Sequence, residues 1–154
     1  MTEVHFVGPS GAGKTTLILG LIALLQRDHV SVAAIKHHHG DLSPERKDSA
    51  RLFATGTPTV LLAADGVLEM AVSPTLDDAK RRLPRATRLL LVEGIKEYPG
   101  AKVWVGPGCP ADLPGLLAVV SGPAPAPCLH IPDRDPEAVY RQVVKPLLAA
   151  ATGR

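Results

Sequence analysis

The sequence has few cysteines, no asparagine and no long apolar segment, and these absences exclude several classes of protein. Its two cysteines, Cys109 and Cys128, match no close zinc or redox spacing and are too few for a disulfide framework, so we expect free thiols. No apolar run reaches the roughly 18 residues of a membrane span, and the N-terminus lacks the basic and apolar regions of a signal peptide. We therefore expect a cytoplasmic protein without a membrane partner.

The composition is that of one folded domain. The chain has 154 residues, of which 45% are hydrophobic and 21% charged, and this balance excludes a disordered chain despite 14 glycines and 15 prolines. We expect a single domain over residues 1–154. The 17 Lys and Arg residues nearly cancel the 15 Asp and Glu residues, and a net charge of +2 provides no strong field for binding nucleic acid.

Apolar runs alternate with helical patterns along the chain. A short run at Val4–Val7 precedes a glycine-rich turn and a helical pattern, and Val30–Ile35 follows as a largely buried second strand. Later strands are expected at Thr59–Ala64, Val67–Val72, Leu89–Val92, Lys102–Val105 and Leu116–Val120, and later helices at Lys47–Thr55, Leu76–Leu83 and Pro136–Ala151. This order predicts an α/β fold with a mainly parallel sheet and helices on both faces.

The glycine-rich turn fits the phosphate-binding pattern G-x-x-x-x-G-K-[ST]. It follows a predicted strand and opens a predicted helix, which is the structural context that the motif requires, so the α/β fold is expected to be of the P-loop NTPase type. Backbone N–H groups of such a loop point at phosphate oxygens, and the helix N-terminus adds partial positive charge. Lys14 is expected to reach the β and γ phosphates and to act in catalysis, and Thr15 to ligate Mg²⁺. The predicted nucleotide-binding residues of this turn are Gly8, Pro9, Ser10, Gly11, Ala12, Gly13, Lys14, Thr15 and Thr16.

A carboxylate ends another buried strand. Leu89–Val92 is followed by Glu93 and Gly94, the arrangement of a Walker B element, which places an acid beside Mg²⁺ at the carboxyl edge of the sheet. Glu93 is therefore predicted as a metal ligand and as a catalytic group that organises water. An ordinary acid at the end of a strand is the alternative.

Three adjacent histidines follow the second strand at the same sheet edge. Lys36 and His37 are predicted to contact phosphate or substrate, and Asp41 to contact nucleotide or metal, with Asp48 as a further candidate acid. Side chains of an extended segment alternate in direction, so three adjacent histidines cannot all face one way. A transition-metal site made by His37 and His39 stays an alternative, although no cysteine or second histidine cluster completes it, and a solvated loop is the other alternative.

These motifs, with two others, resemble those of the MobB family of molybdopterin-guanine dinucleotide biosynthesis adaptor proteins. The resemblance runs from the first strand to the last helix. Three positions depart from the family pattern: Gly40 stands where a His is usual, Arg46 where a Gly is usual, and Arg88 where an Asp opens the Walker B strand. The segments that carry the resemblance are Gly13-Lys-Thr-Thr-Leu17, Ile35-Lys-His-His-His-Gly-Asp41, Arg46-Lys-Asp-Ser49, Ala54-Thr-Gly-Thr57 and Leu91-Val-Glu-Gly-Ile-Lys96.

The resemblance implies a Mg²⁺-dependent GTP-binding protein that is at most a weak GTPase. It also implies a homodimer that assists a MobA-like guanylyltransferase in attaching GMP to molybdopterin. The residues themselves do not select guanine, because the N-K-x-D element of many GTPases needs an asparagine and no T-K-x-D replaces it. The preference for GTP over ATP therefore rests on the resemblance.

Two other functions fit parts of the sequence. A metal-inserting chaperone GTPase would use the histidines at 37–39 as metal ligands. A small-molecule kinase would need an arginine-rich lid, and Arg81, Arg82 and Arg85 could supply one, although they also fit a solvated helix face.

The segment after Glu93 suggests a dimer contact. It turns at Tyr98-Pro-Gly100 and returns through Lys102–Val105, which predicts a hairpin projecting from the sheet. Such a hairpin would expose its strand edges and Trp104, which a symmetry mate could cover. Packing of Trp104 on its own domain is the alternative.

Overall fold

The computed structural model describes residues 1–37, 51, 55–56, 59–70 and 75–152 of the chain. The backbone divides into two units: Met1–His37 with Pro84–Arg154, and His38–Leu83. The first unit carries the glycine-rich loop, and the second carries a small hairpin and a helix. A single domain over residues 1–154 stays a prediction.

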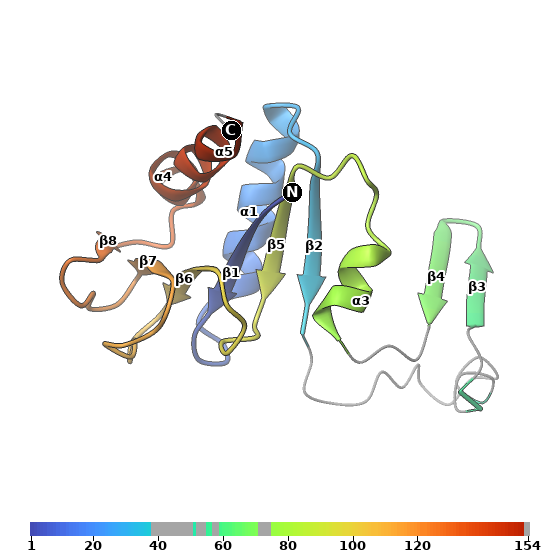
Figure 1. Ribbon diagram of the computed structural model, residues 1–154, viewed down its shortest axis with the longest axis horizontal. Coiled ribbons are helices and arrows are strands. Elements are labelled where there is room, and N and C mark those ends of the chain that lie inside the picture. The colour runs from blue at the N-terminus through green and yellow to red at the C-terminus, as the bar shows by residue number, and fades with distance from the viewer. Residues whose placement is uncertain (38–50, 52–54, 57–58, 71–74, 153–154) are drawn as a thin grey trace. The chain divides into compact units, whose positions relative to one another are not determined.

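A six-stranded parallel sheet forms the centre of the first unit (Figure 1). Every neighbouring pair of strands is parallel, so the carboxyl ends of all six strands meet at one edge of the sheet. Ligands of open α/β sheets bind at this edge. In spatial order the strands are β2 (Val32–Lys36), β5 (Leu89–Glu93), β1 (Thr2–Val7), β6 (Ala101–Val105), β7 (Leu116–Val120) and β8 (Leu129–Ile131).

The apolar runs of the sequence form the central strands of this sheet. Residues 89–92 of β5 are fully buried, because parallel strands covered on both faces read as continuous apolar runs. β2 was expected to be largely buried as well, but it lies at the edge of the sheet and is only half-buried. An apolar composition alone therefore does not distinguish an edge strand from a central one.

Helices cover one face of the sheet. They are α1 (Lys14–Arg27) and the C-terminal run of α4 (Pro136–Val139), the π-helical η1 (Tyr140–Val144) and α5 (Lys145–Thr152). The predicted α/β fold with a mainly parallel sheet is confirmed. Helices were expected on both faces; among the described residues of the first unit they lie on one face, and the connections between strands cover the other. In the described ranges no helix is long and apolar enough to cross a membrane.

The predicted C-terminal helix is present with a widened turn in its middle. Pro146 has no N–H to offer the preceding turn, and its ring crowds the backbone there, which disfavours regular α-helical bonding. The π-helical turn at Tyr140–Val144 lies just before this proline, and π-turns accommodate such an interruption without ending the helix.

The hairpin predicted after Glu93 is wrong, because this segment leads to strand β6. It lies inside the sheet, parallel to β1 and β7, and Trp104 is only 7% exposed. The Trp104 indole packs on Val7 and Val119, and its N–H donates to the Pro107 carbonyl oxygen at 3.1 Å. The tryptophan therefore packs on its own unit and not on a symmetry mate.

The register explains why a short connection can cross the sheet. Phe6 of β1 pairs with Glu93 on one side, and Val4 pairs with Ala101 on the other. The connection from β5 to β6 therefore has to go back along β1 by only about two residues, or roughly 7 Å, from the level of Phe6 to the level of Val4. The turn signals between these strands serve this crossover, which local sequence cannot distinguish from a hairpin.

The crossover packs over His5 of β1, which is fully buried. Its ring stacks on Tyr98 with 5.3 Å between ring centroids, and its Nε2 lies 2.6 Å from a Glu3 carboxylate oxygen. Its Nδ1 lies 3.4 Å from the carbonyl oxygen of Gly94, the residue after Glu93. These contacts hold the crossover against the sheet face that no described helix of the first unit covers.

Cys109 and Cys128 are free thiols, as predicted. Both are half-buried beside the Trp104 cluster, and burial raises the pKa of each thiol. Both side chains therefore stay protonated at neutral pH.

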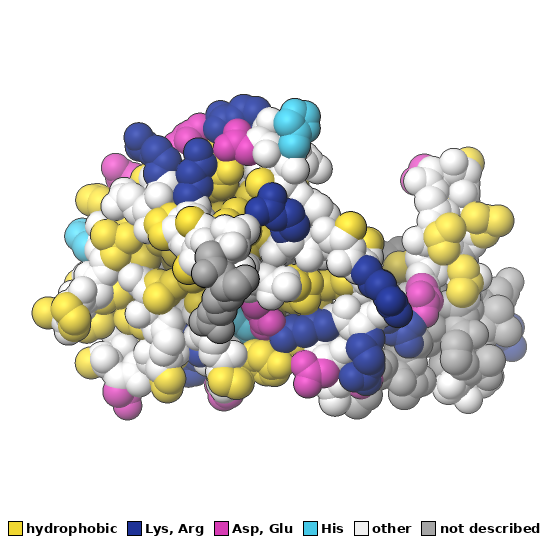
Figure 2. Space-filling view, turned by 45° about the horizontal axis from the view of Figure 1, so that its top comes forward, with side chains coloured by type: hydrophobic (Ala, Val, Ile, Leu, Met, Phe, Trp, Pro, Cys, Tyr) yellow, Lys and Arg dark blue, Asp and Glu magenta, His cyan; other side chains and the backbone are white. Residues whose placement is uncertain are grey.

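The second unit contains an antiparallel hairpin of β3 (Thr59–Ala63) and β4 (Gly66–Met70), followed by α3 (Leu76–Arg81). Thr75 caps α3 by accepting a hydrogen bond from the Asp78 N–H at 3.1 Å. The expected strands at 59–64 and 67–72 are confirmed where the residues are described, and most of the expected helix at 47–55 lies outside the described residues. Among the described side chains of the hairpin, four large apolar ones are exposed, by 54–84% (Figure 2): Val60, Leu62, Val67 and Leu68.

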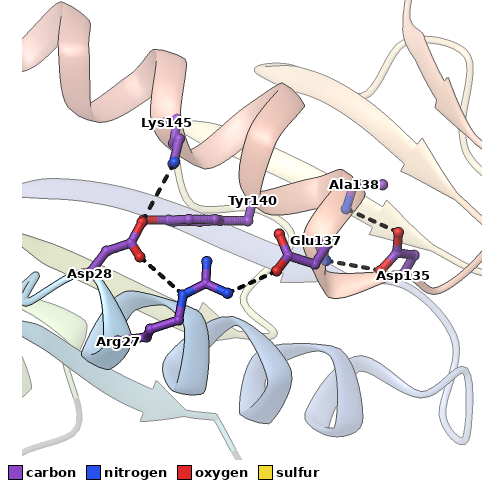
Figure 3. A network of polar contacts seen from close by, with 7 residues as sticks. All are labelled: Arg27, Asp28, Asp135, Glu137, Ala138, Tyr140 and Lys145. Carbon is purple, nitrogen blue, oxygen red and sulfur yellow. Dashed lines mark hydrogen bonds and ion pairs between the residues drawn. The ribbon is translucent and has the colours of Figure 1, made fainter.

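A polar network joins the end of α1 to the C-terminal helices (Figure 3). The Tyr140 hydroxyl donates to an Asp28 carboxylate oxygen at 2.7 Å, and Lys145 pairs with the same carboxylate at 3.5 Å. Arg27 pairs with both Asp28 and Glu137 at 3.1 Å. The hydrogen bond from Tyr140, and then that from Arg27, lower the pKa of Asp28, while burial and Asp28 raise the pKa of Tyr140 to about 12.

We expect Tyr140→Phe to lower the free energy of unfolding by about 1.5 kcal/mol at pH 7, because a partly buried hydrogen bond to a carboxylate is lost. The ring and its contact with Lys145 Nζ, 4.9 Å from the ring centroid, are kept, so the variant isolates the hydroxyl. Urea unfolding at pH 7 and pH 3 measures the effect.

The difference between wild type and Tyr140→Phe should shrink in acid. A lowered folded-state pKa of Asp28 stabilises the fold above the ordinary Asp pKa, and this contribution is lost as the pH falls through the lowered value. The raised pKa of Tyr140 affects stability at alkaline pH. Its contribution to the free energy of unfolding is complete below about pH 10 and is lost as the pH rises through about 12. An equal difference at pH 3 and pH 7 would contradict the role given to the ionised Asp28.

Candidate functional site

The glycine-rich loop joins β1 to α1 at the carboxyl edge of the sheet. Gly8 has a φ of +140°, and a Cβ there would lie 2.2 Å from the Val105 carbonyl oxygen of β6, so no larger residue fits. Gly13 has a φ of +87° and directly precedes the first residue of α1. Glycine is therefore required both for close approach to the sheet and for the left-handed turn into the helix.

The N-terminus of α1 is open to a ligand. No described side chain caps it, and its first turn holds no acidic residue, so its first N–H groups are free to bind an anion. Thr15 and Thr16 of this turn are exposed. A phosphate group is the kind of ligand that such an end of a helix binds.

Lys14 folds back over the loop. Its Nζ donates to the carbonyl oxygens of Gly8 at 3.0 Å and Pro9 at 2.6 Å. The ammonium group is therefore held at the mouth of the loop, where it could exchange these carbonyl oxygens for phosphate oxygens.

Thr15, Lys36 and Glu93 form a cluster beside the loop, contributed by α1, β2 and β5. The Thr15 hydroxyl donates to Glu93 Oε2 at 2.7 Å and accepts from Lys36 Nζ at 3.2 Å. Lys36 Nζ also pairs with Glu93 Oε1 at 3.1 Å. A hydroxyl and a carboxylate that meet in this way are hard oxygen donors, which fit Mg²⁺.

The ends of β1, β2 and β5 are tied together behind this cluster. The His37 N–H donates to the Glu93 carbonyl oxygen, and the Gly94 N–H donates to the Phe6 carbonyl oxygen, both at 2.9 Å. Gly94 has a φ of +98°, and a Cβ there would lie 3.3 Å from the His37 Cβ. His37 is thereby placed directly beside the turn that follows Glu93.

The other predicted residues of this edge are not placed. Asp41, Asp48, His38 and His39 lie outside the described residues. Within the described part of the chain no group of three or more His, Cys, Asp or Glu side chains is gathered for a metal ion.

Two of the arginines considered for a kinase lid are engaged in their own unit. Arg81 pairs with Asp78 of the same helix, and Arg82 pairs with Glu69 of β4. These ion pairs fit a solvated helix better than a lid that closes over an acceptor.

No sequence motif indicated a role for Arg134. This residue lies in the connection between β8 and α4, and its Nη1 donates to the Ala12 carbonyl oxygen at 3.2 Å, across 122 residues of sequence. The contact depends on the order of strands in the sheet, which no local motif encodes.

The family model described as Molybdopterin guanine dinucleotide synthesis protein B matches residues 4–107, more than half of the chain. The chain belongs to the MobB family. The resemblance seen in the motifs is thus confirmed. A relative from Haemophilus influenzae named molybdopterin-guanine dinucleotide biosynthesis adapter protein is 38% identical over 103 residues, which cover 62% of this chain. The match spans only 58% of the length of that relative.

Solved structures of MobB proteins share the fold. MobB of Bacillus subtilis superposes with a TM-score of 0.74 and 22% identity, covering 96% of this chain and 98% of that one. A MobB homologue of Bacillus stearothermophilus gives a TM-score of 0.65 with 22% identity and full coverage of both chains. The α/β fold of the P-loop NTPase type is therefore confirmed. The segment matched by the family model contains the loop, Lys36 and Glu93, whereas Arg134 lies outside it.

Proposed function

We propose that this MobB-family chain binds GTP with Mg²⁺, hydrolyses it weakly, and assists a MobA-like guanylyltransferase in attaching GMP to molybdopterin. Family membership supports the biosynthetic role and the choice of guanine. The site supports triphosphate binding through one observation above all: the 2.7 Å contact between the Thr15 hydroxyl and the Glu93 carboxylate beside the open end of α1. This contact supports a metal site beside a phosphate site, because a hydroxyl and a carboxylate oxygen are suitable ligands for Mg²⁺.

Each residue of the site has a distinct proposed task. Lys14 binds the β and γ phosphates, and Lys36 adds a second positive charge beside them. Thr15 and Glu93 hold Mg²⁺, which supplies positive charge against the phosphates when bound, and Glu93 also orients the attacking water. His37 contacts phosphate or substrate from the end of β2. Asp41, whose place is not described, is proposed as a further ligand of nucleotide or metal.

The proposed setting is the cytoplasm, and the proposed assembly is a homodimer. The exposed apolar side chains of β3 and β4 support the dimer, because a two-stranded hairpin is marginally stable alone and a second copy could cover its apolar surface. The dimer contact proposed here thus moves from Trp104, which is buried, to the hairpin of the second unit.

Equilibrium binding of GTP and ATP, with and without Mg²⁺, tests the proposal. We expect Mg²⁺-dependent binding of GTP in preference to ATP. Thr15→Ala and Glu93→Gln should each weaken binding in Mg²⁺ by at least about tenfold, because a metal ligand is lost, and should change binding in EDTA much less.

The comparison with EDTA separates a metal role from a general one. If both variants lose the same factor with and without Mg²⁺, the metal roles of Thr15 and Glu93 are wrong. Equal affinity of the wild type for GTP and ATP would overturn the choice of guanine while leaving the phosphate site in place.

A further inference from the structure

Arg134 approaches the glycine-rich loop from a part of the chain that no nucleotide motif includes. Its Nη1 donates to the Ala12 carbonyl oxygen at 3.2 Å, and a Cβ built on Gly13 would lie 2.6 Å from the same nitrogen. The side chain therefore lies directly against the last turn of the loop before α1. It is exposed, so a ligand in the loop could reach it.

The segment that carries Arg134 is fixed on both sides. Asp135 caps α4, since its two carboxylate oxygens accept from the N–H groups of Glu137 at 3.0 Å and Ala138 at 3.2 Å. Pro132 and Pro136 flank the segment and restrict its backbone. The Asp135 carboxylate thus caps the helix and is not paired with Arg134, whose guanidinium donates to the loop.

Most of the guanidinium is available to a ligand. An arginine has five N–H donors in a planar fork, and within the described residues only the Nη1 contact with Ala12 engages one of them. Charged arginine donors bind phosphate oxygens with high strength, and often two at a time. The Arg134 guanidinium is therefore suited to a phosphate group that lies in the loop.

The order of strands shows which phosphate it would meet. Lys36 and Glu93 come from β2 and β5, on one side of β1, and they gather at Thr15. Arg134 follows β8, on the other side of β1. If the metal-bound end of a triphosphate lay at Thr15 and Glu93, its α-phosphate and nucleoside would extend toward the opposite flank of the loop, where Arg134 contacts Ala12.

We infer that Arg134 is a nucleotide-binding residue that donates to the α-phosphate of the bound nucleotide. This inference rests on the proposed function, because it assumes that the loop binds a nucleoside triphosphate. The inference assigns a role to the C-terminal third of the chain. It also implies that the positive charge of Arg134 favours a nucleotide, which has an α-phosphate, over a ligand that has only the two terminal phosphates.

The test compares ligands that do and do not reach the α position. GTP and GDP carry an α-phosphate, whereas pyrophosphate with Mg²⁺ is long enough for the two metal-side positions only. Arg134→Ala should weaken GTP and GDP binding by about 10- to 100-fold, the range for charge-assisted hydrogen bonds, and leave Mg²⁺-pyrophosphate binding within about twofold. Arg134→Lys should lie between, because it keeps the charge without the fork.

Control variants identify each kind of failure. Arg141→Ala removes an exposed arginine from η1 and should leave the affinity for every ligand unchanged. If Arg134→Ala weakens pyrophosphate as much as GTP, Arg134 only braces the loop through Ala12, and the inference is wrong. Unchanged GTP affinity in Arg134→Ala overturns it as well. Failure of the proposed function has another signature, since the wild type would then bind neither GTP nor GDP.

Discussion

Replacement of Lys14 by alanine should reduce GTP affinity by at least about 100-fold, because a charged donor to the β and γ phosphates is lost from the centre of the site. The fold should be unaffected, since among the described residues Lys14 Nζ donates only to the carbonyl oxygens of Gly8 and Pro9 in the loop. Calorimetric titration with GTP and Mg²⁺ measures the loss, and circular dichroism with thermal unfolding checks the fold.

Lys14→Arg separates charge from shape. The guanidinium keeps the positive charge but is larger and planar, and it would have to fit between the same two carbonyl oxygens of the loop. We expect this variant to bind GTP nearly as poorly as Lys14→Ala. A folded Lys14→Ala variant with the affinity of the wild type would overturn the assignment of the loop as a phosphate-binding site.

Leu62→Glu should convert the proposed homodimer into a monomer at micromolar concentration. Leu62 is 84% exposed in β3, and burying a leucine contributes about 1.5–3 kcal/mol, twice over in a symmetric dimer. A glutamate at this position would instead have to be desolvated in both copies. Sedimentation equilibrium of the wild type and the variant measures the change.

Leu19→Glu is the matched control, because Leu19 is an equally apolar side chain, 62% exposed, on α1 of the first unit. It should leave the association state unchanged. GTP affinity measured on the Leu62→Glu monomer shows whether the site is complete in one copy. A wild-type chain that sediments as a monomer over the whole concentration range contradicts the dimer proposal.

Much of the fold follows from local sequence. The run of residues 89–92 is apolar at every position, which predicts a strand covered on both faces, and the structure confirms it. The glycines at 8 and 13 stand where the backbone needs a close approach to β6 and a positive φ, so the motif itself encodes the geometry of the loop. The position of Glu93 at a strand end placed it at the same sheet edge as Thr15.

The errors concern contacts between distant segments. The Pro99-Gly100 turn has the same local signature in a hairpin as in a crossover, and only the register of β5 and β6 on β1 distinguishes them. Arg134 contacts Ala12 because it lies in the connection that leads from β8, at the edge of the sheet, to α4, which packs on α1, and this path depends on how all six strands are ordered. Hydrophobic patterns that repeat every 2 or 3.6 residues indicate strands and helices but carry no information on the order of strands in the sheet.

The residues from Arg134 to Lys145 contact the chain near both ends of α1, so the part of the chain beyond the family match contributes to how α1 is held. Near its start, Arg134 contacts Ala12, and at its other end Tyr140 and Lys145 contact Asp28. Strands β7 and β8 also lie beyond residue 107, where the family match ends. We therefore expect the matched segment not to fold by itself: without the residues that follow, β6 would become an exposed edge, and Asp28 at the end of α1 would lose its contacts with Tyr140 and Lys145.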